Sequence, residues 1–236
     1  MPLVSVRPMR RFSTVRITAW LAAAAAFLAF LAAAPPANEP ALGKVLSGIE
    51  LRYNSLATLQ SEFEQTMSYA GRPRRAERGM LYLRRPKMML WRYSDPEGKF
   101  AVGDGEILHQ YNPLTNQVRQ VKMDETGDMR APLAFLLGRL RFRRLFRNLR
   151  VEQRDGKHIL IGDGRSGKEA YRDVEFTYEP TDFRLLHIAV NGADGTVTSF
   201  GFANEKVNLR LDEAMFEFRP PPGAEVLNDF DTGGAQ

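Results

Sequence analysis

The sequence predicts a mainly β protein built as one antiparallel meander, on the basis of two observations. Apolar and polar residues alternate with period two in a long series of short segments, and turn pairs such as Asp104-Gly105, Asp155-Gly156 and Asp194-Gly195 separate them. No helix-length segment lies between most of these strands, which excludes parallel crossovers and nucleotide-binding α/β folds. The 236 residues, 44% hydrophobic and 26% charged, have an ordinary globular composition.

The N-terminus has the organisation of a secretory signal peptide over residues 1–34. Four arginines precede an uncharged apolar run at 19–34, and a proline-containing polar segment follows. The run is shorter than the roughly 20 residues that a membrane span needs, so we predict cleavage between 33 and 38 rather than an uncleaved anchor. Met9 is an alternative start. Removing these four of the 33 basic residues leaves 29 against 28 acidic ones, so a nucleic-acid partner is not expected.

A single domain is expected over 40–228, followed by a flexible tail at 229–236. Residues 41–53 carry apolar side chains at helical spacing, which predicts an opening amphipathic helix. An apolar patch and five arginines at 131–147 predict short helices flanking Gly138. Strands are expected from Leu59 and at 77–85, 87–93, 98–103, 106–112, 117–123, 148–153, 157–162, 172–179, 183–191, 196–203 and 214–219.

Residues that could carry chemistry are few. The chain has no cysteine and three histidines, and it lacks the G-x-S-x-G, H-E-x-x-H, Walker and G-x-G-x-x-G motifs. His109 and His187 fall within predicted strands, where a structural role is the simpler interpretation. We therefore expect no enzyme, no metal and no cofactor, although a Ser/His/Asp site assembled from distant residues stays open.

An arginine among apolar strands is the most informative candidate. Alternation places Leu81, Leu83 and Arg85 on one face of their strand. If that face points inward, Arg85 lies at the edge of an apolar interior with five donors to satisfy. The alternative is a solvated hairpin arginine beside the strand-breaking Pro86.

An ordered set of short motifs runs through the chain: Leu59–Gln65, Gly79–Pro86, Leu90–Pro96, Asp104-Gly105, Tyr111–Pro113, Pro132–Leu137, Asp194–Thr196 and Phe216–Gly223. This set resembles the LolA family, the periplasmic carriers of outer-membrane lipoproteins. The resemblance covers about residues 50–228 and departs from the family at His109, where an aromatic residue is common, and in a heavier arginine cluster at 139–150.

The resemblance implies an incomplete (half) antiparallel β-barrel of about 11 strands that encloses a hydrophobic cavity, with short α-helices as a lid. It also implies that Arg85 bonds the lid backbone and holds the empty cavity shut. We expect a lipid-binding wall of Phe63, Leu81, Leu83, Met89, Trp91 and Phe100. We expect a lid that contains Pro132, Leu133, Phe135, Leu136 and Leu137.

The implied function is that of a monomeric periplasmic shuttle for acylated lipoproteins. It would accept them from an inner-membrane lipoprotein-releasing ABC transporter and deliver them to an outer-membrane acceptor. The acceptor of related fold is a lipoprotein itself, so the absence of cysteine favours the soluble carrier. A lipid-binding sensor or regulatory module of the same shape, a carrier of another lipid, and a lipid-modifying hydrolase are the alternatives.

Overall fold

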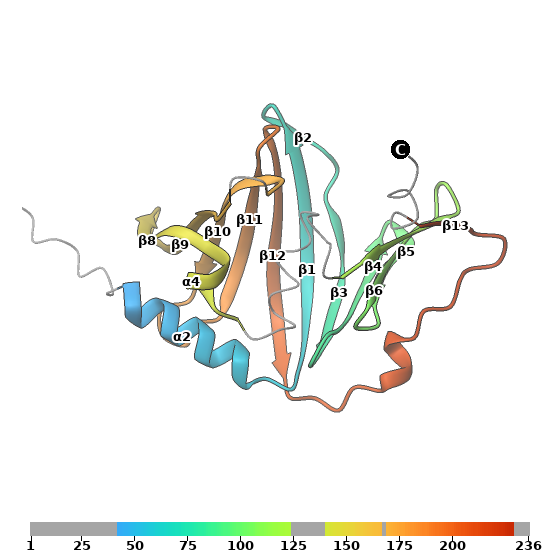
Figure 1. The fold of residues 1–236 in the computed structure, drawn as a ribbon, viewed down its shortest axis with the longest axis horizontal. Coiled ribbons are helices and arrows are strands. Elements are labelled where there is room, and N and C mark those ends of the chain that lie inside the picture. Colours follow the sequence, from blue (N-terminus) through green and yellow to red (C-terminus); the bar gives the residue numbers. More distant parts are fainter. Residues whose placement is uncertain (1–41, 124–139, 167–168, 229–236) are drawn as a thin grey trace, which may run out of the picture. The chain divides into compact units, whose positions relative to one another are not determined.

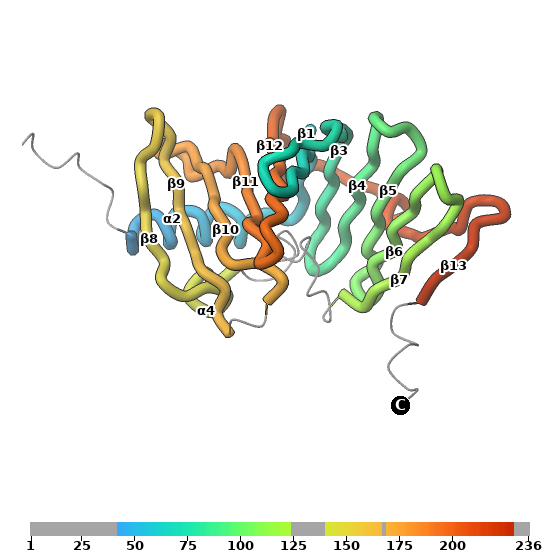
Figure 2. The backbone as a smooth tube through the Cα atoms, turned by 90° about the horizontal axis from the view of Figure 1, so that it is seen from above, coloured from blue at the N-terminus to red at the C-terminus, as the bar shows by residue number. Residues whose placement is uncertain are grey.

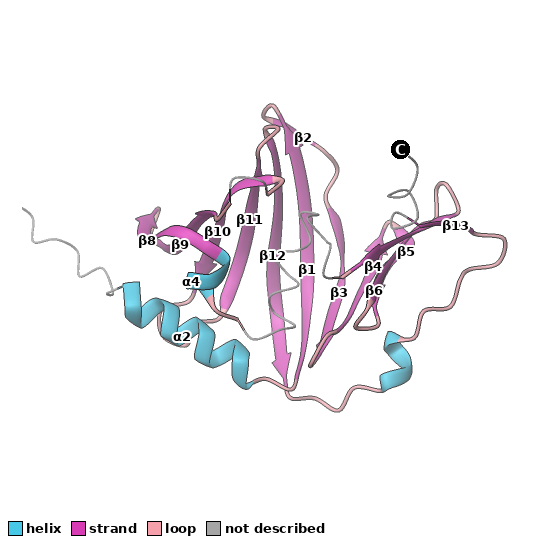
Figure 3. Cartoon of the chain, viewed as in Figure 1, coloured by secondary structure: helices cyan, strands magenta, loops and turns pink. Residues whose placement is uncertain are grey.

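The computed structural model describes residues 42–123, 140–166 and 169–228, and its main feature is one open, curved sheet of 13 strands (Figure 1). Two α-helices, α2 (Leu42–Ser55) and α4 (Phe142–Leu145), and one 3-10 helix, η1 (Glu213–Phe216), complete the elements of these residues (Figure 3). The strands are β1 (Thr58–Tyr69), β2 (Arg72–Pro73), β3 (Glu77–Arg84), β4 (Met88–Asp95), β5 (Glu97–Gly103), β6 (Ile107–Asn112), β7 (Gln117–Lys122), β8 (Phe146–Arg154), β9 (Lys157–Gly164), β10 (Tyr171–Tyr178), β11 (Leu185–Gly192), β12 (Thr196–Val207) and β13 (Glu225–Asn228).

The sheet is a meander whose two halves meet at β1. Strands run in the order β13-β7-β6-β5-β4-β3-β1-β12-β11-β10-β9-β8, and β2 pairs with β1 outside this path. On one side of β1, Leu59 lies opposite Leu83 of β3, and on the other side Phe63 lies opposite Phe202 of β12. Neighbouring pairs are antiparallel except β13, which runs parallel to β7. The chain therefore brings its first and last long strands together in the middle of the sheet.

The helix α2 covers one face of the sheet, which we call the inner face. Its buried residues, Val45, Leu46, Ile49 and Tyr53, recur at three- and four-residue spacing and join the largest apolar core. Figure 2 shows α2 crossing the half of the sheet that contains β8–β12. Burial of each such side chain contributes roughly 1.5–3 kcal/mol, so packing rather than intrinsic propensity holds this helix in place.

The opposite face, which we call the outer face, is covered in the half of the sheet that contains β3–β7. After β12 the chain crosses to this face, and η1 packs on β4. Phe216 of η1, Leu90 of β4 and Val102 of β5 form a second small core there. The chain then pairs as β13 along β7, so the segment closes over β4–β7 from outside (Figure 2).

The predicted fold class is confirmed, with corrections in its details. Eleven predicted strands are present, and the predicted helix at 41–53 is α2. The predicted strand at 214–219 is wrong: Asp212 accepts a hydrogen bond from the amide of Ala214 at 3.1 Å and so starts η1 instead. The short strands β2 and β13 were not predicted. In the segment 131–147, residues 131–139 lie outside the described residues, and the remainder forms α4 and the start of β8.

Candidate functional site: the inner face of the sheet

The inner face carries an aromatic cluster formed by side chains from β1, β4 and β12. The ring of Phe63 packs edge-on against Trp91 with centroids 4.7 Å apart and against Tyr93 at 5.0 Å. Trp91 also contacts Phe200 at 5.5 Å. Edge-to-face packing is the favoured geometry of aromatic pairs. Five predicted wall residues share this face and belong to the same core: Phe63, Leu81, Leu83, Met89 and Trp91.

Phe100, the sixth predicted wall residue, lies on the other face, and this prediction is wrong. It pairs with Arg92 across the ladder, and its ring contacts Tyr111 at 5.2 Å. It packs against the second core under η1. Neighbouring residues in β5 point to opposite faces, and Ala101 is the one that lies beside Trp91 on the inner face.

Methionine and glycine shape the inner face around β5. Met89 is 3% exposed and lies opposite Gly103. A Cβ atom at Gly103 would come within 3.0 Å of Met89 and 3.1 Å of Met123. The missing side chain therefore leaves the room that these two flexible side chains fill. Unbranched methionine adapts to irregular apolar shapes, which suits a surface that accommodates mobile chains.

Arg85 lies at the edge of this face and joins the sheet to α2. Its guanidinium donates to the carbonyl of Tyr53, one of the last carbonyls of α2, which have no partner within the helix. Its amide donates to the carbonyl of Ala57 at 3.0 Å. Burial lowers the pKa of Arg85, although an arginine remains charged in proteins. Arg85 is half-buried against α2, so the solvated-hairpin interpretation is not supported. Its predicted contact with residues 132–138 lies outside the described residues.

The predicted lid residues Pro132, Leu133, Phe135, Leu136 and Leu137 also lie outside the described residues. The chain is described again from Leu140, which is fully buried and joined to α2 by two hydrogen bonds. The Leu140 amide donates to Oδ1 of Asn54 at 2.7 Å, and Nδ2 of Asn54 donates to the Leu140 carbonyl at 3.0 Å. The amide of Phe142 donates to Glu50 at 2.8 Å.

These polar anchors were missed from the sequence. Asn54 and Glu50 follow the helical pattern as ordinary polar residues, and nothing near them in sequence identifies their partners almost 90 residues away. One feature of the sequence could have indicated them: both residues lie on α2 beside its buried residues, where a polar side chain can reach a neighbouring backbone. Together with Arg85, they connect α2 to the sheet and to the chain at Leu140 and Phe142.

Residues 54–219 match the family model described as outer membrane lipoprotein carrier protein LolA. The chain belongs to the LolA family. Two relatives named outer-membrane lipoprotein carrier protein are similar to it, one from Methylococcus capsulatus, 27% identical over 75% of this chain and 84% of that protein, and one from Chromobacterium violaceum, 25% identical over 87% and 95%. A LolA superfamily structure from Nitrosomonas europaea aligns over 75% of this chain and 97% of that one, with 13% identity and a TM-score of 0.44.

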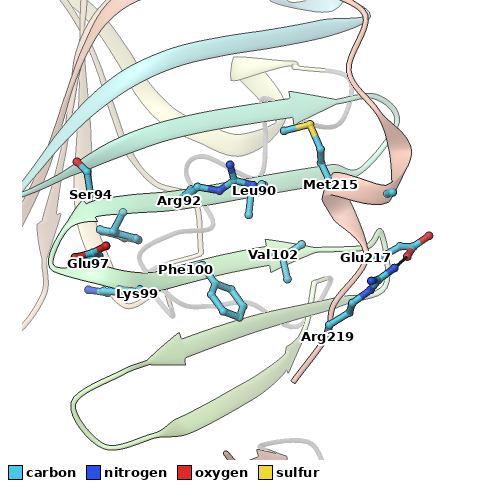
Figure 4. Close-up of a pocket in the computed structure, with 13 residues that line it drawn as sticks. Leu90, Arg92, Ser94, Glu97, Lys99, Phe100, Val102, Met215, Glu217 and Arg219 are labelled. Atoms are coloured by element: carbon cyan, nitrogen blue, oxygen red, sulfur yellow. Dashed lines mark hydrogen bonds and ion pairs between the residues drawn. The ribbon is translucent and has the colours of Figure 1, made fainter. Parts of the chain in front are cut away.

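This LolA family protein also has a groove on the outer face of the sheet, with a volume of about 760 Å³ (Figure 4). Its floor is apolar, and η1 forms one side. Charged residues at its rim are engaged locally: Arg219 pairs with Glu217 at 3.1 Å, and Lys99 pairs with Glu77 at 2.6 Å. The lining residues drawn in Figure 4 include Leu90, Arg92, Ser94, Glu97, Phe100, Val102 and Met215.

The histidines of this LolA family protein have structural surroundings. His109 is buried between Asp104, at 3.3 Å, and Gln120, at 2.9 Å, and its ring stacks on Phe218 at 3.9 Å. Burial lowers the pKa of His187. Among the described residues, no group of His, Asp and Glu has the arrangement of a metal site. Over the same residues, no helix has the length and apolar character needed to cross a membrane.

Proposed function

We propose that this protein is a periplasmic carrier that binds the acyl chains of lipoproteins on the inner face of its sheet and delivers them to the outer membrane. The observation that carries the proposal is the single apolar face on which Phe63, Met89 and Trp91 lie together, with Arg85 at its edge. Membership of the LolA family supports it, because relatives of the chain are named outer-membrane lipoprotein carrier proteins.

The energetics of the task agree with such a face. At about 0.8 kcal/mol per buried CH₂, an acyl chain of about a dozen carbons resists leaving a bilayer by roughly 10 kcal/mol. A carrier must offset most of this in water, so its binding surface must be apolar and extended. It must also release the chain, which favours adaptable contacts through methionine over a rigid, fully complementary pocket.

The finer steps follow from the same proposal. The carrier receives lipoproteins from an inner-membrane ABC transporter and transfers them to an outer-membrane acceptor. Residues 1–34 act as a cleaved signal that directs it to the periplasm. It catalyses no reaction and works as a monomer. Arg85 joins α2 to the sheet and favours the closed state of the empty carrier, which helps to expel the acyl chains at the acceptor.

Met89→Glu tests the proposed binding face. A carboxylate at a position that is 3% exposed must either remain buried at high cost or become protonated, so we expect loading with acylated lipoprotein to fall at least tenfold. Ser94→Glu, on the exposed side of the same strand, is the control. Loading is measured by co-purification and mass spectrometry of bound lipoprotein, and circular dichroism verifies that each variant folds. Normal loading of a folded Met89→Glu protein would rule out this face.

A further inference from the structure

A corner of the molecule concentrates arginines that the carrier function does not use. The one-turn helix α4 carries Arg143 and Arg144, and Arg141 precedes it. Arg147 follows at the start of β8, an edge strand of the sheet, and Arg165 follows the end of β9. The guanidinium of Arg165 donates to the carbonyl of Arg143 at 2.8 Å, which brings the two segments together. We call these five residues the basic corner.

The carboxylates around the basic corner accept hydrogen bonds from groups other than the five arginines. Asp163, which lies opposite Arg147 in the ladder, accepts hydrogen bonds from Arg150 at 3.0 Å and from Asn148 at 2.9 Å. Glu169 accepts from the amide of Ser166 at 2.9 Å.

Glu50 of α2 accepts a hydrogen bond from the amide of Phe142. Within the part of the chain that the structure describes, no ion pair joins any of the five arginines to a carboxylate. The corner therefore carries an excess of positive charge in a chain whose mature part is nearly neutral.

An apolar side chain is exposed among these charges. Leu145 is the last residue of α4 and is 37% exposed, whereas its neighbours Phe142 and Phe146 are buried in the core. These two phenylalanines anchor the turn to the sheet, and the side chains of Arg143, Arg144 and Leu145 between them are exposed to solvent. Figure 1 shows α4 next to the end of the sheet formed by β8 and β9. A protruding turn with arginines around an exposed leucine suits a flat, anionic, partly apolar surface.

We propose that the basic corner is a contact site for a bilayer that contains anionic phospholipid. The planar guanidinium groups match phosphate oxygens in a fork geometry, and Leu145 reaches the boundary between headgroups and acyl chains. Such a contact is weak and reversible, because each basic residue near an anionic surface strengthens binding only about fivefold. Weak contact suits a protein that must leave the membrane again. The inference is separate from the acyl-binding face, since it concerns the surface of the molecule.

Vesicle binding tests the proposal without any lipoprotein. The protein starting at residue 40 is mixed with vesicles of 30% phosphatidylglycerol in phosphatidylcholine, or of phosphatidylcholine alone, and the bound fraction is measured by sedimentation. We expect the protein to bind only the anionic vesicles. The binding should weaken as the salt concentration rises, because screening shortens the range of the attraction. Arg143→Gln with Arg144→Gln should weaken binding roughly 10- to 25-fold. Leu145→Gln should weaken it less and leave the salt dependence unchanged.

The control removes the same charge elsewhere. Arg72 and Arg74 are exposed near the β1–β2 turn, and Arg72→Gln with Arg74→Gln should leave binding within about twofold of the wild type. Equal losses in the two double variants would mean that only net charge matters and would overturn the proposal. Absence of binding to anionic vesicles would overturn it as well and would point to an acidic protein as the partner. Either result leaves the carrier function untouched, because lipoprotein loading is measured in a different assay.

Discussion

The two halves of the sheet are covered on opposite faces. In the β8–β12 half, α2 packs on the inner face, and the outer face carries ion pairs such as Arg154–Glu175, at 2.9 Å. In the β3–β7 half, the segment after β12 packs on the outer face, where Phe216 forms a second core with Leu90 and Val102. The difference shows that the covering segment decides which residues of a strand are buried.

The same difference suggests a division of roles between the halves. Phe176 in the β8–β12 half is completely buried among Phe142, at 5.2 Å, and Phe146, at 5.6 Å, which is the packing of a permanent core. The inner face of the β3–β7 half instead combines Met89 with Trp91. We therefore expect the β8–β12 half to supply most of the stability and the β3–β7 half to supply most of the binding.

Phe176→Ala gives the largest expected effect. Removing a fully buried phenylalanine should lower the free energy of unfolding by about 3–5 kcal/mol and destabilise the whole domain. Phe216→Ala is the matched substitution in the other half; it should cost less and expose mainly residues 208–224 to protease, because it detaches only the covering segment. Urea denaturation and limited proteolysis measure the two effects. If Phe216→Ala proved the more destabilising, the proposed division between the halves would be wrong.

Arg85→Leu tests the connection between the halves. It removes the charge-assisted hydrogen bond from the guanidinium to the Tyr53 carbonyl, worth about 1.5–3 kcal/mol, so the empty closed state becomes less favourable. Loading should persist because apolar burial drives it, while release to the acceptor should slow roughly tenfold. Arg85→Lys should restore release only in part, since an ammonium lacks the guanidinium fork.

Arg84→Leu is the matched control, because Arg84 pairs with Glu213 at 3.0 Å on the outer side. Loading and release rates are measured separately for each variant with a labelled lipoprotein. Release by Arg85→Leu at the wild-type rate would show that this arginine is not a gate.

The smallest effect is expected at Asp104, beside His109. Burial opposes its ionisation, but the amides of Ile107 and Glu106 and the ring of His109 stabilise the carboxylate, so the pKa of Asp104 lies below its ordinary value. A lowered pKa stabilises the fold above about pH 4 and loses this contribution as pH falls through the folded value. Asp104→Asn should cost less than about 1 kcal/mol at pH 7.

The cost of Asp104→Asn should disappear at lower pH. Thermal unfolding of the variant and the wild type from pH 7 to pH 3 measures this difference. Asp155→Asn, in an exposed turn, serves as the control. A difference between Asp104→Asn and the wild type that stayed constant down to pH 3 would contradict the assigned role of the carboxylate.

Local alternation was enough to predict eleven strands and the side of β4 on which Met89 and Trp91 lie, because period two is a property of the chain itself. The error at Phe100 has a physical cause. The run from Phe100 to Val102 is apolar on both faces because η1, more than 100 residues later, covers the outer one. Nothing in the local pattern separates the two faces of such a run. The bonds of Asn54 and Glu50 to the chain near residue 140 were equally invisible, since they join polar residues that lie far apart in sequence.

The central claim, that acyl chains bind the inner face, is tested most directly through Trp91. The sequence has two tryptophans, Trp20 and Trp91, so in a protein that starts at residue 40 the tryptophan fluorescence comes from Trp91 alone. A lipopeptide whose acyl chains carry bromine atoms should quench this fluorescence, because bromine acts only at short range, and the same lipopeptide without bromine should not. Binding that is detected by an independent method but leaves Trp91 unquenched would place the acyl chains elsewhere and contradict the account.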